Sequence, residues 1–174
     1  MQRILSAATL GLKARVVEVE VDLFIGLHIF NIVGLGDKAV EESKERVSAA
    51  IKNTELIPPR KKNKRLIVNL APADLKKQGP AYDLPIALGY LLASNQINFD
   101  AKNCLFAGEL ALDGQIRPVN GALLIALLCK EQKIKTLFIP KKNAQEAAMV
   151  KDLKIIPVES LSLRLSTSEK PNSI

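Results

Sequence analysis

Hydrophobic and polar residues alternate strictly between residues 14 and 24. Val17, Val19 and Val21 share one side of this stretch, and Glu18, Glu20 and Asp22 share the other. A two-residue period predicts a strand with one face buried and one face in water. Gly26 interrupts the pattern, and residues 28–33 predict a second short strand that ends at a glycine-rich turn, residues 34–36. We expect the two strands to pair as a hairpin.

The period becomes helical after Asp37. The apolar residues Val40, Val47, Ala50 and Ile51 recur at helical spacing, while charged residues cover the other side. Asp37 suits the N-cap position, so we expect an amphipathic helix that ends near Asn53. Two prolines at positions 58–59 then end regular structure, and residues 66–70 predict a buried strand. Asp83 is placed to cap a second helix over residues 84–93, which is apolar on nearly all sides and tolerates Pro85 in its first turn.

Strands and helices alternate in the second half of the chain. Residues 104–112 predict a strand, Asp113-Gly114 a tight hairpin turn and residues 115–119 the returning strand. The later residues predict four more elements, which are a buried helix over residues 121–130, a strand over 136–139, a short helix over 143–149 and a strand over 155–158. Residues 166–174 carry no apolar period and predict a linker. We therefore expect one α/β domain over residues 1–165, followed by a linker over residues 166–174.

Composition narrows the class of protein. The 174 residues are 48% hydrophobic, which is enough for a real core, but there is no Trp and few aromatic side chains that could stack on bases. A net charge of +7 favours phosphate-rich partners.

The sequence predicts neither a secretion signal nor a membrane span. Lys13 and Arg15 interrupt the mildly apolar start too early for a secretion signal. The longest apolar run, residues 84–93, has about half of the ~20 residues that a membrane span needs. We expect a cytoplasmic protein without membrane contact, with Cys104 and Cys129 as unpaired core residues.

Residues that could carry chemistry are sparse. No phosphate-binding loop of the Gly-x-x-x-x-Gly-Lys-Ser/Thr type is present, and residues 34–38 lack both its spacing and its hydroxyl. His28 is the only histidine, so neither a His/Cys zinc site nor, without His28, a Ser-His-Asp triad can form. Glu109 and Asp113 could act as acid and base, but solvation of a strand edge and the turn explain them more simply. We predict no catalytic, cofactor-binding or metal-binding residues.

Part of the sequence resembles the proteolytic domain of Lon-type proteases. The resemblance lies in residues 108–110, 112–114, 116–119, Gly121 and 134–140. That family uses a serine nucleophile and a lysine base. At the corresponding positions this sequence has Ala81 and Ile125, which can supply neither group. The resemblance therefore implies a former catalytic pocket that is now filled by apolar packing.

A longer resemblance runs through residues 30–35, 39–47, 50–53, 68–75 and 83–88. These motifs resemble the amino-terminal domain of Mg-chelatase-related AAA+ proteins of the ComM (YifB) family. Gly36 and His28 depart from that pattern, since prolines are usual there, and residues 58–64 are more basic than is typical. The resemblance implies an α/β (α+β) fold of the ribosomal-small-subunit/Lon type, a mixed sheet with helices packed mainly on one face. It also implies an AAA+ motor beyond this segment, and ATP and Mg²⁺ are expected for the motor alone.

The family resemblance implies a hexameric helicase that promotes DNA branch migration in natural transformation. Expected partners are the chain's own AAA+ domain, neighbouring subunits and DNA. A cluster of cations, the first candidate for DNA contact, consists of Arg60, Lys61, Lys62, Lys64, Arg65, Lys76 and Lys77. A solvated loop is the simpler interpretation of this charge run.

The alternative function is a protein-interaction or hexamer-assembly module without DNA contact. It would use the hairpin at residues 113–114 or the loop at residues 71–79, which we expect to line the former catalytic cleft. Residual proteolysis is weakly supported because Ala81 and Ile125 occupy the dyad positions. Metal insertion is weakly supported because the sequence contains neither a metal-ligand cluster nor a large aromatic pocket.

Overall fold

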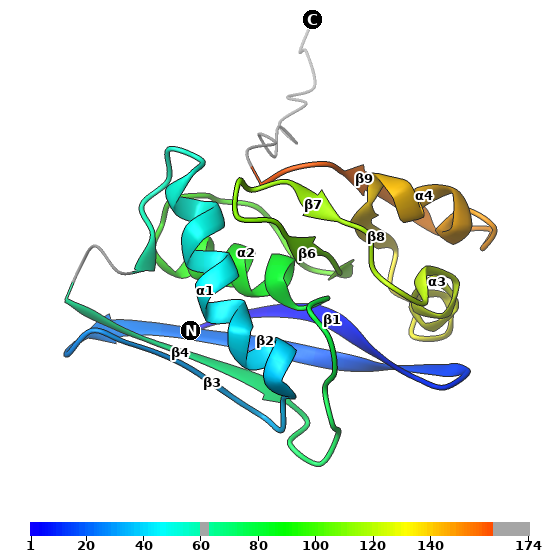
Figure 1. Ribbon diagram of the computed structural model, residues 1–174. Helices are drawn as coiled ribbons and strands as arrows, with labels where there is room; N and C mark the ends of the chain where they lie inside the picture. The colour runs from blue at the N-terminus through cyan, green and yellow to red at the C-terminus, as the bar shows by residue number, and fades with distance from the viewer. Residues whose placement is uncertain (60–62, 162–174) are drawn as a thin grey trace, which may run out of the picture.

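A seven-stranded mixed sheet organises the molecule (Figure 1). The computed structural model describes residues 1–59 and 63–161. Within them the order of strands across the sheet is β3-β4-β2-β1-β5-β8-β9, and a separate two-stranded sheet pairs β6 with β7. The strands are β1 Gln2–Leu10, β2 Lys13–Ile25, β3 Ile29–Val33, β4 Lys64–Ala71, β5 Cys104–Phe106, β6 Glu109–Leu110, β7 Ile116–Arg117, β8 Thr136–Pro140 and β9 Lys154–Val158. The helices are α1 Lys38–Lys52, α2 Asp83–Ala93, α3 Ala122–Glu131 and α4 Lys141–Ala147.

The described residues therefore form a mixed α/β fold with four helices, as the sequence predicts. The β1–β2 and β2–β4 pairs are antiparallel, whereas β3–β4, β1–β5, β5–β8 and β8–β9 are parallel. The predicted amphipathic helix is confirmed as α1, and the Asp37 side chain accepts a hydrogen bond from the backbone N–H of Val40 at 2.9 Å. No helix in the described ranges combines the length and the apolar character needed to cross a bilayer.

The strand pairing differs from the expected hairpin. β3 does not pair with β2; β4 lies between them and pairs with β3 in parallel and with β2 antiparallel. The partner of β2 in the hairpin is instead β1, a strand that sequence patterning did not identify. Both faces of β1 contribute to the core, so its residues do not alternate between apolar and charged types.

The helices are divided between the two faces of the sheet, which corrects the expectation that they lie mainly on one face. Ile4 of β1 and Val19 of β2 belong to a first apolar cluster with α1 and α2, whereas Ala7 of β1 and Val16 of β2 pack in a second cluster with α3 and Ala147 of α4. Because successive residues of a strand point to opposite faces, these two clusters lie on opposite sides of the sheet. In Figure 1, α1 and α2 lie together over the β1–β4 part, and α3 lies apart from them.

Two further expectations are wrong in detail. The predicted strand over residues 104–112 is interrupted after Phe106, so that β5 joins the large sheet while β6 forms the small hairpin with β7. The Asp113-Gly114 turn of that hairpin is confirmed, with the N–H of Gly114 bonded to the carbonyl of Ala111 at 3.0 Å. Asp83 does not cap α2: Tyr82 occupies the N-cap position, and Asp83 is the first helical residue.

Candidate functional site

The two positions that correspond to a Ser–Lys dyad lie in the same apolar cluster. Ile125 of α3 is buried in the second cluster, and Ala81, which precedes α2, is half-buried against it. The backbone carbonyl of Ala81 accepts a hydrogen bond from the N–H of Gly108 at 2.9 Å. These side chains carry neither a hydroxyl nor an amine, so this place provides packing and no nucleophile.

Asp83 is the centre of a buried polar cluster that joins three elements. Its carboxylate accepts hydrogen bonds from Ser43 Oγ at 2.5 Å, from Arg46 Nε at 2.6 Å and Nη2 at 3.0 Å, and from the N–H of Leu110 at 3.1 Å. Ser43 and Arg46 belong to α1, Asp83 to α2 and Leu110 to β6. The cluster therefore holds both helices and the small hairpin in one arrangement.

The charges of this cluster depend on one another. Burial raises the pKa of the Asp83 carboxyl, while the hydrogen bonds from Arg46 and Ser43 act in the opposite direction. The hydrogen bond with Asp83 raises the pKa of Arg46, so the guanidinium stays charged and neutralises the buried carboxylate. Sequence reasoning missed this pair because the two residues are 37 positions apart and no local pattern connects them.

The structure separates the predicted DNA-contacting cations. Lys64 and Arg65 begin β4, whereas Lys76 lies beyond its end, in the loop that follows. A strand of this length spans roughly 23 Å, at about 3.3 Å for each residue step. Arg60, Lys61 and Lys62 lie outside the described residues. Lys64 and Arg65 are therefore the described cations that stay together at the start of β4, with their side chains on opposite faces of the strand.

Lys77 is a buried structural cation. Its side chain is inaccessible to solvent, and its ammonium donates hydrogen bonds to the carbonyl of Gly34 at 2.6 Å and to that of Pro72. Burial lowers the pKa of Lys77, and the charge of Asp74 acts in the opposite direction. We therefore leave Lys77 out of the proposed DNA surface.

The loop over residues 71–79 is fastened to the turn between β3 and α1. The N–H of Lys77 bonds to the carbonyl of Leu35 at 3.0 Å, and the N–H of Asp37 bonds to the carbonyl of Lys77 at 3.0 Å. The second carboxylate oxygen of Asp37 accepts a hydrogen bond from the N–H of Gly79 at 3.1 Å. One residue, Asp37, thus caps α1 and also anchors this loop.

An apolar and basic surface lies where β2 ends and where β3 and β4 begin. We call it the sheet tip and define it by five residues: Phe24, Ile25, Leu27, Lys64 and Arg65. Ile25 is opposite Lys64 and Phe24 is opposite Arg65 in the β2–β4 register. The guanidinium carbon of Arg65 lies 5.9 Å from the centroid of the Phe24 ring, a cation–π distance. In the described part of the chain neither Lys64 nor Arg65 forms an ion pair.

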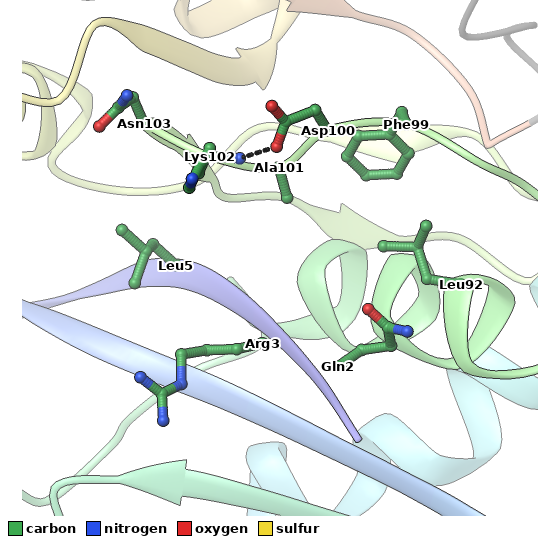
Figure 2. A pocket seen from close by; sticks show the side chains of 9 residues that line it. All are labelled: Gln2, Arg3, Leu5, Leu92, Phe99, Asp100, Ala101, Lys102 and Asn103. Carbon is green, nitrogen blue, oxygen red and sulfur yellow. Dashed lines mark hydrogen bonds between the residues drawn. The ribbon is translucent and has the colours of Figure 1, made fainter.

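A groove of about 390 Å³ lies where β1 and β5 begin (Figure 2). Its lining mixes apolar and polar side chains: Gln2, Arg3, Leu5, Leu92, Phe99, Asp100, Ala101, Lys102 and Asn103. Arg3 is already paired with Glu18 at 3.2 Å and Glu20 at 3.4 Å, and Figure 2 shows its guanidinium pointing away from the loop of Asp100. The Asp100 carboxylate accepts a hydrogen bond from the backbone N–H of Lys102 at 2.9 Å. Because Arg3 and Asp100 already have partners within the protein, we assign no ligand to this groove.

The remaining chemical candidates are far less organised. His28 is exposed in the segment between β2 and β3, Glu109 pairs with Arg117 at 3.3 Å, and Asp113 accepts a hydrogen bond from the N–H of Gln115 inside its turn. Both cysteines are free; Cys129 is buried and Cys104 is half-buried. Within residues 1–59 and 63–161, no group of three or more His, Cys, Asp or Glu residues is arranged to hold a metal ion.

Comparison with known proteins identifies the family. The model of the family described as subunit ChlI of Mg-chelatase matches residues 19–143. The chain is 44% identical over 148 residues to competence protein ComM of Haemophilus influenzae. This match covers 84% of this chain and 28% of ComM. It is 39% identical over 144 residues to uncharacterized protein YifB of Escherichia coli K12, and this match covers 82% of this chain and 28% of YifB. It is 37% identical over 160 residues to an uncharacterized protein of Mycobacterium tuberculosis, and this match covers 91% of this chain and 31% of that protein.

The chain spans less than a third of the length of these curated relatives. Similarity to ComM and to the chelatase subunit supports an AAA+-family protein. The expected resemblance is thereby confirmed over most of the chain, and we conclude that the chain belongs to the family of the Mg-chelatase subunit ChlI, as a homologue of ComM and YifB.

Proposed function

We propose that this segment is a non-catalytic accessory domain of an AAA+ ATPase, and that it contacts DNA through Lys64 and Arg65. The whole protein would be a hexameric, ATP- and Mg²⁺-dependent helicase that promotes branch migration during natural transformation. The similarity to competence protein ComM supports this role for the whole protein. Ala81 and Ile125 support the absence of a proteolytic function.

The sheet tip is the observation that carries the DNA contact. Lys64 and Arg65 are adjacent in sequence, begin the same strand and lack an ion-pair partner in the described ranges. Arg60, Lys61 and Lys62 precede them in the sequence and add three further positive charges. Clustered cations that are not neutralised by carboxylates bind phosphates by releasing condensed counterions, and this binding needs no base-reading element.

Fluorescence anisotropy with labelled single-stranded and forked DNA tests this proposal. We expect the variant K64Q/R65Q to bind on the order of tenfold more weakly at low salt, and the slope of log affinity against log salt to fall by roughly 1.5, since two phosphate contacts are lost. The matched control K135Q/K151Q removes the same charge from two exposed lysines on the β8–β9 side of the molecule.

The control distinguishes a local contact from a general charge effect. An equal loss in K135Q/K151Q would mean that only net charge matters, and unchanged binding in K64Q/R65Q would contradict the proposed surface. If the unmodified chain binds no DNA even at low salt, the role of an assembly or partner-recognition module takes its place.

A further inference from the structure

The sheet tip exposes large apolar side chains to water. Ile25 is 89% exposed, Leu27 83% and Phe24 42%. These three residues lie within four positions at the end of β2, and we call them the apolar patch, although Phe24 and Ile25 are consecutive strand residues and so point to opposite faces of the sheet. Exposed apolar groups of this kind on soluble domains mark contact sites. Leu27 lies between β2 and β3, outside both strands, so backbone pairing does not explain its position.

Charge surrounds this apolar patch without entering it. No Asp, Glu, Lys or Arg occurs from residue 23 to residue 36, although 25% of the chain is charged. The neighbouring cations come from β4, where Lys64 is opposite Ile25 and Arg65 is opposite Phe24. The guanidinium of Arg65 lies against the Phe24 ring, so a positive charge borders the patch at a fixed place.

We propose that Ile25 and Leu27 pack against unpaired bases at the branch point of forked DNA, while Lys64 and Arg65 bind the flanking phosphates. This inference rests on the proposed function, and it adds the DNA form and the mode of contact. Bases in a duplex are stacked inside it, whereas bases at a fork expose apolar faces next to charged phosphates. Aliphatic side chains that insert at base steps, supported by cations on the backbone, are an established way for proteins to hold unstacked DNA.

Forked DNA with 2-aminopurine at the branch point tests the inference, because the fluorescence of this base rises when it is unstacked. Anisotropy of a second dye on the same DNA reports binding in the same sample. We expect the unmodified chain to raise the 2-aminopurine signal. The variant I25S/L27S should lose most of that rise while its affinity changes by less than about threefold, since the phosphate contacts remain.

Two variants keep the result interpretable. L12S/L127S removes two other exposed leucines, one in the β1–β2 turn and one on α3, and should behave like the unmodified chain. L27S alone changes a residue outside any strand, so it tests the same contact if I25S/L27S does not fold.

Each remaining outcome overturns the inference. An undiminished fluorescence rise in I25S/L27S would show that the apolar residues do not touch the bases. Binding without any rise in the unmodified chain would overturn the inference but leave the DNA-binding proposal standing, whereas no binding at all would overturn both. A fall in sedimentation coefficient on the I25S/L27S change would identify the patch as a contact between protein chains.

Discussion

Asp83 illustrates how a single residue can hold a fold together. Its carboxylate is fully buried, and it is matched by donors from Arg46, Ser43 and the backbone of Leu110. A buried charge is costly in free energy unless it is paired and hydrogen-bonded. Removing the carboxylate leaves its donors without the partner that they share.

The substitution Asp83→Asn should therefore lower the free energy of unfolding by about 3–5 kcal/mol, because the partly buried guanidinium of Arg46 loses its counter-charge. Ser43→Ala removes one donor and leaves the ion pair intact, so about 1 kcal/mol is expected. Urea denaturation followed by circular dichroism measures both. Similar losses in the two variants would show that the ion pair contributes nothing beyond one ordinary hydrogen bond.

At the scale of single residues, the sequence predicts only part of the candidate DNA-binding site. The basic cluster was visible as a run of cations, but the run does not reveal that Lys77 points inward to the carbonyls of Gly34 and Pro72. Nor does it reveal that β4 places Lys64 and Lys76 at opposite ends of a strand. Burial and separation are set by chain segments distant in sequence, which a local charge count does not include.

At the scale of elements, local patterns predicted individual helices and strands better than their pairing. Asp37 and the helical period located α1 because both signals lie within the helix itself. The alternation in β2 identifies a strand but not its neighbours, so the sequence predicts a hairpin with β3, whereas the hairpin partner in the structure is β1. β1 gave no signal because Ser6, Ala7 and Ala8 are all buried, which removes the alternation.

The turn that ends β3 depends on a glycine. Gly34 has a φ of 110°, and a Cβ atom there would lie 2.2 Å from the carbonyl oxygen of Leu70 in β4. Gly34→Ala should lower the free energy of unfolding by about 3 kcal/mol or more, because the clash is with backbone that cannot rotate away.

Gly11 in the β1–β2 turn is the matched control for that substitution. Its φ is 58°, but a Cβ there would have no atom within 4 Å. Gly11→Ala should cost only the conformational strain, about 1–2 kcal/mol. Thermal or urea unfolding compares the two variants, and equal losses would show that the contact with Leu70 is unimportant.

At the scale of the whole molecule, one sheet is shared by two apolar clusters. β1 and β2 contribute residues to both clusters, so neither cluster can lose its packing while the sheet stays intact. We therefore expect a single cooperative unfolding transition over the described residues.

Two sets of native probes can check this cooperativity. Tyr82 and Tyr90 report on the first cluster by fluorescence, and Cys129 reports on the second, because burial raises the pKa of its thiol to about 12 and keeps it unreactive until the protein unfolds. Pulsed iodoacetamide labelling, mapped by mass spectrometry, should give the same urea midpoint as tyrosine fluorescence.

Ile125→Ala should lower the free energy of unfolding by about 2–5 kcal/mol and shift both midpoints together. A shift in the thiol midpoint alone would show that the clusters unfold separately.

The central position of the β1–β2 hairpin also affects the order of events during synthesis. The ribosome releases this hairpin before α2, at residues 83–93, and before β5, at residues 104–106, which are the elements that cover one face of β1 and pair with its free edge. α3, which covers the opposite face, is released later still. For that interval the nascent chain can form only the β3-β4-β2-β1 part of the sheet, in which the face of β1 that packs on α2 stays uncovered and its edge toward β5 stays unpaired. Newly made chains are therefore most exposed to aggregation, and most in need of chaperone binding, before residue 106 has emerged.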